Sequence, residues 1–188
     1  MNWVTVLIAG YLLTGIDLGL REGVQLWPTH IAPSLVIPFV VYVALFAPHT
    51  AALWTGLLIG MVVDLSTPRG PADALTIVVG PHALGFLVAA YFVITVRSMV
   101  IRRNPLTLGA VSALAAAIAY LIAIVLLQIR SWCGDPINFS LGDEILQRLG
   151  SALATGISGM ALSVVLFPMF PVFGFHDPAT RRFTRREG

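Results

Sequence analysis

Long apolar runs, separated by short polar or proline-containing breaks, make up most of this 188-residue chain. Cutting the chain at the breaks gives six hydrophobic segments, at residues 3–19, 34–47, 51–65, 72–98, 106–129 and 144–170. A helix needs about 20 residues to cross the hydrocarbon of a bilayer, so six helices would take about 120 residues and leave short connections. The pattern predicts an all-α integral membrane protein with six transmembrane helices in a single membrane domain, residues 1–188.

The second and third segments are short, at 14 and 15 residues, and only Pro48, His49 and Thr50 separate them. So short a break favours two antiparallel helices in a tight hairpin. The alternative is four full spans plus a hairpin that enters only half of the membrane. A second alternative concerns Pro81, because proline favours a helix start or a kink. A fourth helix that begins there would end near Arg97, and 68–79 would be a loop or a short lead-in helix.

Composition agrees with a membrane protein, since the mean hydropathy is +0.90 and only 11% of the residues are charged. So few charges cannot cover the surface of a water-soluble protein of this size. The first segment lacks the basic start and the cleavage pattern of a signal peptide, so we expect it to be retained. Cys133 is the only cysteine, which excludes an internal disulfide.

Arginine supplies all of the positive charge, because the chain contains no lysine. With six crossings, seven of the eleven arginines fall on one side, which the positive-inside rule assigns to the cytoplasm. We therefore expect both termini in the cytoplasm, a basic cytoplasmic tail at 177–188, and no nucleic-acid partner. The seven, which we expect at the lipid headgroups, are Arg97, Arg102, Arg103, Arg181, Arg182, Arg185 and Arg186.

Two glycines and an acid recur at four-residue spacing in the third segment, at Gly56, Gly60 and Asp64. Four residues are slightly more than one helical turn, so the three positions lie along one stripe of a helix. Such a stripe lets a second helix approach closely. It would serve either internal packing, including close packing of the second and third segments, or a partner's helix.

Few polar groups lie at membrane depth, and each is a functional candidate because burial in hydrocarbon is costly. Asp64, Arg97 and Gln128 lie near predicted helix ends, where they would reach the interface. His82 is the deepest, and would either bond to a neighbouring helix or serve as a ligand or switch. We find no paired aspartates, no Ser/His dyad and no His-Glu metal motif, so we predict no enzymatic activity and no cofactor or metal.

Residues 33–105 resemble the rod shape-determining protein MreD family. The resemblance lies in Val-Tyr-Val-Ala-Leu at 41–45, Gly-x3-Gly-x3-Asp-Leu at 56–65, Gly-x-His-Ala-Leu-Gly at 80–85, a tyrosine after it, and a basic turn before Asn-Pro at 104–105. Residues 66–79 are longer than the corresponding link of the family. The resemblance implies that seven residues shape the helix bundle and a groove for a partner. They are Gly56, Gly60, Asp64, Gly80, His82, Gly85 and Tyr91. It also suggests that Asp64 caps a helix end through Arg69 or a backbone donor.

This resemblance implies a non-enzymatic scaffold of the bacterial cell-elongation complex in the inner membrane. Members are expected to bind the membrane helix of MreC and to work beside MreB, RodA and a transpeptidase in peptidoglycan synthesis. Their bundle is similar to that of the substrate-binding subunits of energy-coupling-factor vitamin transporters. Such a subunit is the alternative function, with Trp27, Trp132 and the 128–146 loop as pocket residues. The first helix lacks the Ala-x3-Ala docking face expected of that class, which favours the scaffold.

Overall fold

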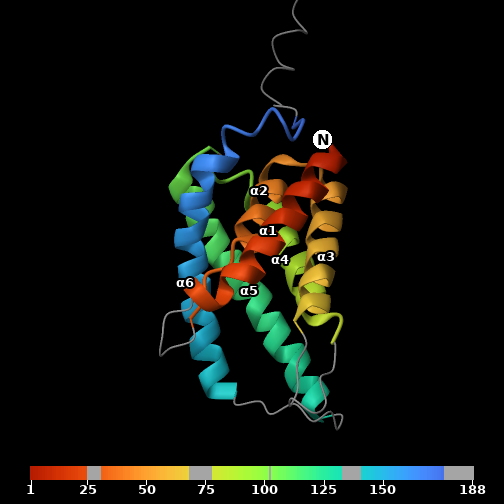
Figure 1. The fold of residues 1–188 in the computed structure, drawn as a ribbon, viewed down its shortest axis with the longest axis vertical. Helices are drawn as coiled ribbons and strands as arrows, with labels where there is room; N and C mark the ends of the chain where they lie inside the picture. Colours follow the sequence, from red (N-terminus) through yellow and green to blue (C-terminus); the bar gives the residue numbers. More distant parts are fainter. Residues whose placement is uncertain (25–30, 68–77, 102, 133–140, 176–188) are drawn as a thin grey trace, which may run out of the picture.

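The computed structural model describes residues 1–24, 31–67, 78–101, 103–132 and 141–175, which form an all-helical bundle (Figure 1). The helices are α1 (Trp3–Val24), α2 (Val36–Phe46), α3 (His49–Ser66), α4 (Pro81–Val96), α5 (Pro105–Trp132) and α6 (Leu141–Leu166). Among the described residues, three helices are long and apolar enough to cross a membrane, over His49–Ser66, Pro105–Arg130 and Glu144–Leu166. Shorter apolar helices accompany them, and the chain is a multi-pass membrane protein.

α2 is the centre of the bundle. Every residue from Val36 to Leu45 is buried, and α2 contacts α3, α4, α5 and α6. Around it, α3 packs on α4, α4 on α5 and α5 on α6, while α1 lies on the outside against α2 and α3 (Figure 1). An 11-residue helix is only about 16 Å long, so α2 is too short to cross the hydrocarbon by itself.

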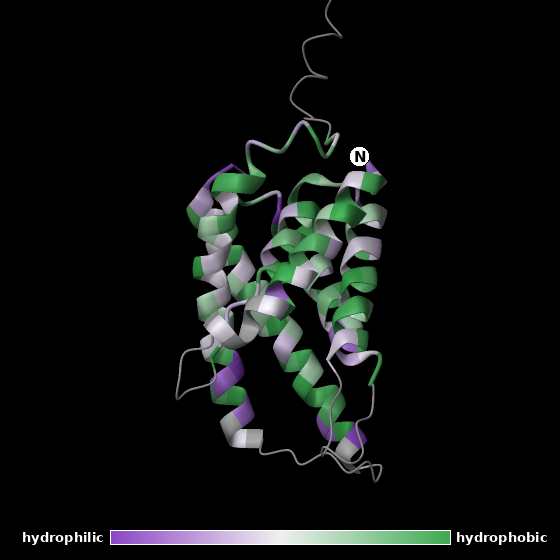
Figure 2. Ribbon diagram, viewed as in Figure 1, coloured by the Kyte–Doolittle hydropathy of each residue, from purple (hydrophilic) through white to green (hydrophobic). Residues whose placement is uncertain are grey.

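α5 and α6 are the longest helices, and their lower parts extend past the ends of the other four (Figure 1). Their 28 and 26 residues correspond to about 42 and 39 Å, against about 30 Å for the hydrocarbon. Hydrophilic residues gather on the lower part of α6 and at the lower ends of α3 and α5 (Figure 2). The bundle therefore has an apolar body and a more polar lower end.

The opposite end of the bundle is closed by the segment after α6. The Asn2 backbone N–H donates to the Phe173 carbonyl at 2.9 Å, and the Tyr42 hydroxyl donates to the Leu166 carbonyl at 2.9 Å. Several rings of this end pack edge-on or tilted against one another, with centroids 5.1–6.3 Å apart: Phe39, Tyr42, Phe46, Phe167, Phe170, Phe173 and Phe175. The N-terminus and the last described residues thus meet at one end.

The predicted hairpin is present, because α2 ends at Phe46 and α3 begins at His49. The predicted segment 72–98 is too long as a helix: α4 begins at Pro81 and ends at Val96. Gly80 precedes it with φ = 130°, a conformation open to glycine, and Pro81 fits the first turn because its missing N–H is not needed there. Arg69, Arg102 and the tail at 177–188 lie outside the described residues.

Candidate functional site

Asp64 caps the N-terminus of α4. Its carboxylate oxygens accept N–H bonds from the backbone of Gly80 at 2.9 Å and of His82 and Ala83 at 3.1 Å each. The first turn of a helix leaves its N–H groups without intrahelical partners, and a negative charge there also suits the helix dipole. Of the two anchors expected for Asp64, the backbone donor is confirmed, and Arg69 lies outside the described residues.

His82 joins the same carboxylate, with Nδ1 2.7 Å from Asp64 Oδ1. The exposed fractions of the two residues are 6% and 2%. Asp64 is therefore buried against the α4 N-terminus, and its place at the membrane interface stays a prediction. His82 is hydrogen-bonded to a neighbouring helix, as one of its two interpretations held. The pair ties α3 to α4 within the bundle.

The glycine stripe is used inside the bundle. A Cβ on Gly56 would lie 2.9 Å from the Phe86 carbonyl oxygen, and one on Gly60 would lie 2.6 Å from Ala83 Cα. The stripe therefore packs on α4, and not on α2 as the hairpin argument expected. Gly85 continues this packing on the other side of α4, where a Cβ would lie 2.6 Å from the Ala119 carbonyl oxygen of α5.

Charged side chains cap both ends of the buried α2. At its start, Asp17 of α1 accepts the Leu35 N–H at 2.5 Å and lies 3.4 Å from the Ser34 hydroxyl, which donates to it. At its end, Arg97 Nη1 donates to the Ala47 carbonyl at 2.8 Å and to the Ala44 carbonyl at 3.3 Å. Each charge has the sign that the helix dipole favours. Arg97 thus donates hydrogen bonds to backbone carbonyls inside the bundle. The sequence analysis expected only an arginine at the lipid headgroups.

Small hydroxyl side chains of α6 complete the start of α2. Thr155 Oγ1 accepts the Ser34 N–H at 3.0 Å, Ser151 Oγ accepts the Ala32 N–H at 3.3 Å, and Ser158 Oγ donates to the Ser34 carbonyl at 2.8 Å. In hydrocarbon a backbone group without a partner costs several kcal/mol. These contacts explain how a helix can begin in the middle of the bundle.

A polar cavity of about 60 Å³ lies beside the starts of α2 and α4. Asp17 and Ser34 line it next to α2, His82 lines it on α4, and Tyr120 and Arg148 line it from α5 and α6. The sequence analysis singled out neither Asp17 nor Arg148 and missed this convergence. The one available signal was that Asp17 is the only charge within the apolar segment 3–19.

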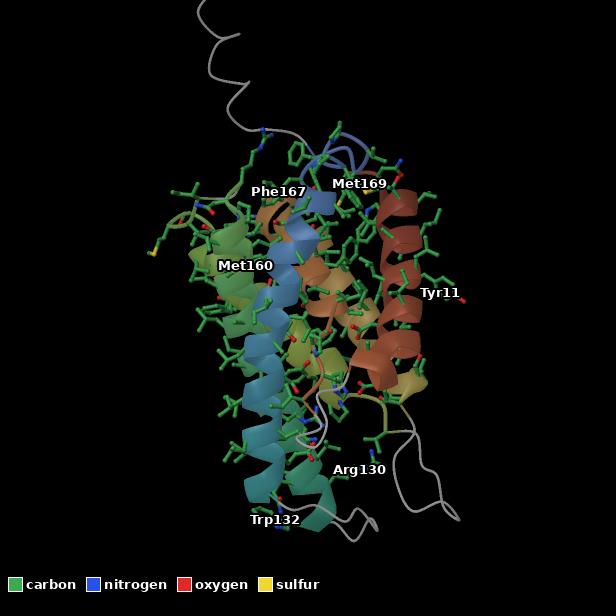
Figure 3. All side chains as sticks on the ribbon, turned by 60° about the vertical axis from the view of Figure 1, so that its left-hand side comes forward. Tyr11, Arg130, Trp132, Met160, Phe167 and Met169 are labelled. Carbon is green, nitrogen blue, oxygen red and sulfur yellow. The ribbon has the colours of Figure 1, made fainter. Side chains whose placement is uncertain are left out.

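An apolar groove of about 250 Å³ runs between α1 and α3 on the outside of the bundle. Its lining is almost entirely hydrocarbon, from Val6, Leu7, Gly10, Tyr11, Thr14, Thr55, Leu58, Ile59 and Val62. Tyr11 projects from α1 at its rim (Figure 3). Tyr91, a predicted partner residue, is 63% exposed on α4 and does not line this groove.

Within the described part of the chain, no three His, Cys, Asp or Glu side chains are placed to hold a metal ion. Comparison of the whole chain with protein-family models, with curated proteins and with solved structures found no match.

Proposed function

We propose that this protein is a non-enzymatic scaffold of the bacterial cell-elongation complex, similar to MreD, which binds the membrane helix of an MreC-type bitopic protein. RodA, a transpeptidase and MreB are the further partners of this complex, and peptidoglycan synthesis and cell shape are the processes it supports. The proposal starts from the motifs at 33–105. The structural observation that carries it is the apolar groove between α1 and α3.

The groove has the chemistry that a membrane helix requires and is long enough to hold about two of its turns. It follows α1 from Val6 to Thr14, about 12 Å or two helical turns, and α3 over a similar distance. Gly10, Thr14 and Thr55 are small, and membrane helices associate by close packing at small residues. We place the partner helix here, because the Gly56 and Gly60 stripe is already covered by α4.

The arrangement of charges supports an inner-membrane protein with both termini in the cytoplasm. Arg103 lies with its guanidinium 4.9 Å from the centroid of Phe170, and Arg97 holds the end of α2. Both arginines are at the end of the bundle where the N-terminus meets Phe173. Six membrane crossings bring these parts to one side, and the positive-inside rule makes that side cytoplasmic.

The vitamin-transporter alternative needs a pocket for a vitamin-sized ligand. Pockets for drug-sized ligands measure about 300–1,000 Å³. The polar cavity described here holds about 60 Å³. Trp27 and residues 133–140, which that alternative requires, lie outside the described residues. At about 60 Å³, the described polar cavity is by itself too small for a vitamin-sized ligand.

Purification of the tagged chain from its native membrane, with mass spectrometry of the bound proteins, tests the proposal. Leu58→Trp fills the groove from a residue that is 38% exposed, whereas Leu84→Trp adds the same bulk to an exposed position on α4. We expect an MreC-type protein with the wild type and with Leu84→Trp, and its loss with Leu58→Trp. Recovery of ATPase and coupling subunits, or equal recovery of the MreC-type protein with both variants, contradicts the proposal.

A further inference from the structure

Tyr11 carries a hydroxyl group on the outer surface of α1, at the rim of the α1–α3 groove. Its side chain is 76% exposed and points away from the bundle (Figure 3). Tyr11 lies eight residues after Trp3, which is about 12 Å along α1 from the end of the bundle that the aromatic rings close. With Trp3 at one boundary of a hydrocarbon layer about 30 Å thick, we expect Tyr11 well inside that layer.

The other hydroxyl groups of the groove already donate hydrogen bonds within their own helices. Thr14 Oγ1 donates to the Gly10 carbonyl and Thr55 Oγ1 donates to the Ala51 carbonyl, each at 2.8 Å. Both threonines are buried in the floor of the groove. Among the described residues, the Tyr11 hydroxyl has no hydrogen-bond partner. Tyr11 is therefore the side-chain donor that the groove still has available for an occupant.

The unused hydroxyl distinguishes between a lipid tail and a protein helix as the occupant of the groove. A polar group in hydrocarbon costs free energy unless it finds a hydrogen-bond partner, because water is absent there. An acyl chain carries no acceptor, so it would fill the groove and leave the Tyr11 hydroxyl unsatisfied. A membrane helix can bring a polar side chain to this position, since such side chains form hydrogen bonds between membrane helices.

We propose that Tyr11 donates a hydrogen bond to a hydroxyl or carboxamide side chain on the partner helix. This assignment rests on the proposed scaffold function, because the same groove receives that helix. The floor of the groove offers no free donor, so the polar residue lies at the edge of the partner's contact face, on the side of α1. The partner is then an apolar helix with one Ser, Thr, Asn or Gln at this depth. A helix without one leaves the Tyr11 hydroxyl unpaired and is selected against.

Binding of a labelled MreC-type protein to the labelled full chain in proteoliposomes, measured by fluorescence energy transfer, tests this assignment. Tyr11→Phe removes only the hydroxyl, and Tyr91→Phe removes the same group from an exposed position on α4 outside the groove. We expect Tyr11→Phe to weaken binding about three- to tenfold, as the loss of one neutral hydrogen bond does, and Tyr91→Phe to leave binding unchanged. The thermal stability of the unbound chain should be the same with and without the Tyr11 hydroxyl.

Alanine in place of the polar side chain on the partner helix identifies the acceptor. The altered partner should bind the wild type as weakly as the unaltered partner binds Tyr11→Phe, and the two changes together should add nothing further. Binding that Leu58→Trp abolishes but Tyr11→Phe leaves unchanged overturns the role of Tyr11 and retains the scaffold function. Absence of binding to the wild type overturns both. Weakening by Tyr91→Phe in place of Tyr11→Phe also overturns the role of Tyr11, because the contact then lies on α4.

Discussion

Single side chains decide how closely α3 and α4 approach. Gly60 lies where a Cβ would be 2.6 Å from Ala83 Cα and 2.7 Å from the His82 carbonyl oxygen. Backbone cannot move aside as a flexible side-chain end can. A larger residue at position 60 must therefore push the two helices apart, which would also disturb the Asp64 contacts one turn away. The conformation of the whole α3–α4 pair depends on this missing side chain.

We predict that Gly60→Ala lowers the free energy of unfolding by about 1–3 kcal/mol, as overpacking of a tight contact does. The matched control is Gly15→Ala on α1, where an added Cβ meets nothing within 4 Å. The control should be neutral or more stable by up to about 1 kcal/mol, because alanine favours a helix. Thermal unfolding of both variants in the same detergent measures the difference. Equal stability of the two variants would show that α3 and α4 are not packed through Gly60.

Two short helices, α2 and α4, owe their starts to carboxylates supplied by other helices. Asp17 serves α2 and Asp64 serves α4, and both helices are shorter than the roughly 20 residues of a full span. A short helix leaves backbone ends at a depth where water is scarce. The carboxylates provide the partners that water provides elsewhere.

We predict that Asp64→Ala lowers the free energy of unfolding by at least about 2 kcal/mol. The substitution leaves the N–H groups of Gly80, His82 and Ala83 without this acceptor. It also removes the hydrogen-bond partner of the His82 ring. Ser66→Ala is the control, because the exposed Ser66 hydroxyl bonds only within its own helix in the contacts described. It should change stability by less than about 0.5 kcal/mol. Thermal unfolding followed by circular dichroism gives both values, and a small effect at Asp64 would argue against the cap.

Hydropathy was sufficient to predict the α2–α3 hairpin and the helices apart from the start of α4, because each apolar run has to form helix in a membrane. It could not predict which helices are neighbours. Spacing showed the stripe of Gly56, Gly60 and Asp64, but periodicity on one helix carries no information about which helix covers it. The polar cavity was missed for the same reason. Asp17 and Arg148, which both line it, are 131 positions apart in the sequence and come together only in the fold.

The whole molecule is asymmetric along its long axis. Aromatic rings and the chain's start close one end, and the lower parts of α5 and α6 project at the other, where Arg130 and Trp132 lie (Figure 3). From Leu166 to Leu146, α6 rises about 30 Å, which is the thickness of the hydrocarbon. With Leu166 taken as one membrane boundary, we expect Leu146, which is 79% exposed, at the other boundary, and Met99, which is 87% exposed in the turn after α4, near the first.

This geometry predicts opposite labelling of single cysteines at the two ends. In a Cys133→Ala background, a membrane-impermeant maleimide added to intact cells should label Leu146→Cys, while Met99→Cys should react only after the membrane is opened. The arginine count sets the direction, because Arg97 and Arg103 flank Met99. Labelling of both cysteines from outside would contradict six crossings of the bundle. Labelling of Met99→Cys alone from outside would retain the crossings but invert the protein, and the polar cavity would then lie at the cytoplasmic end.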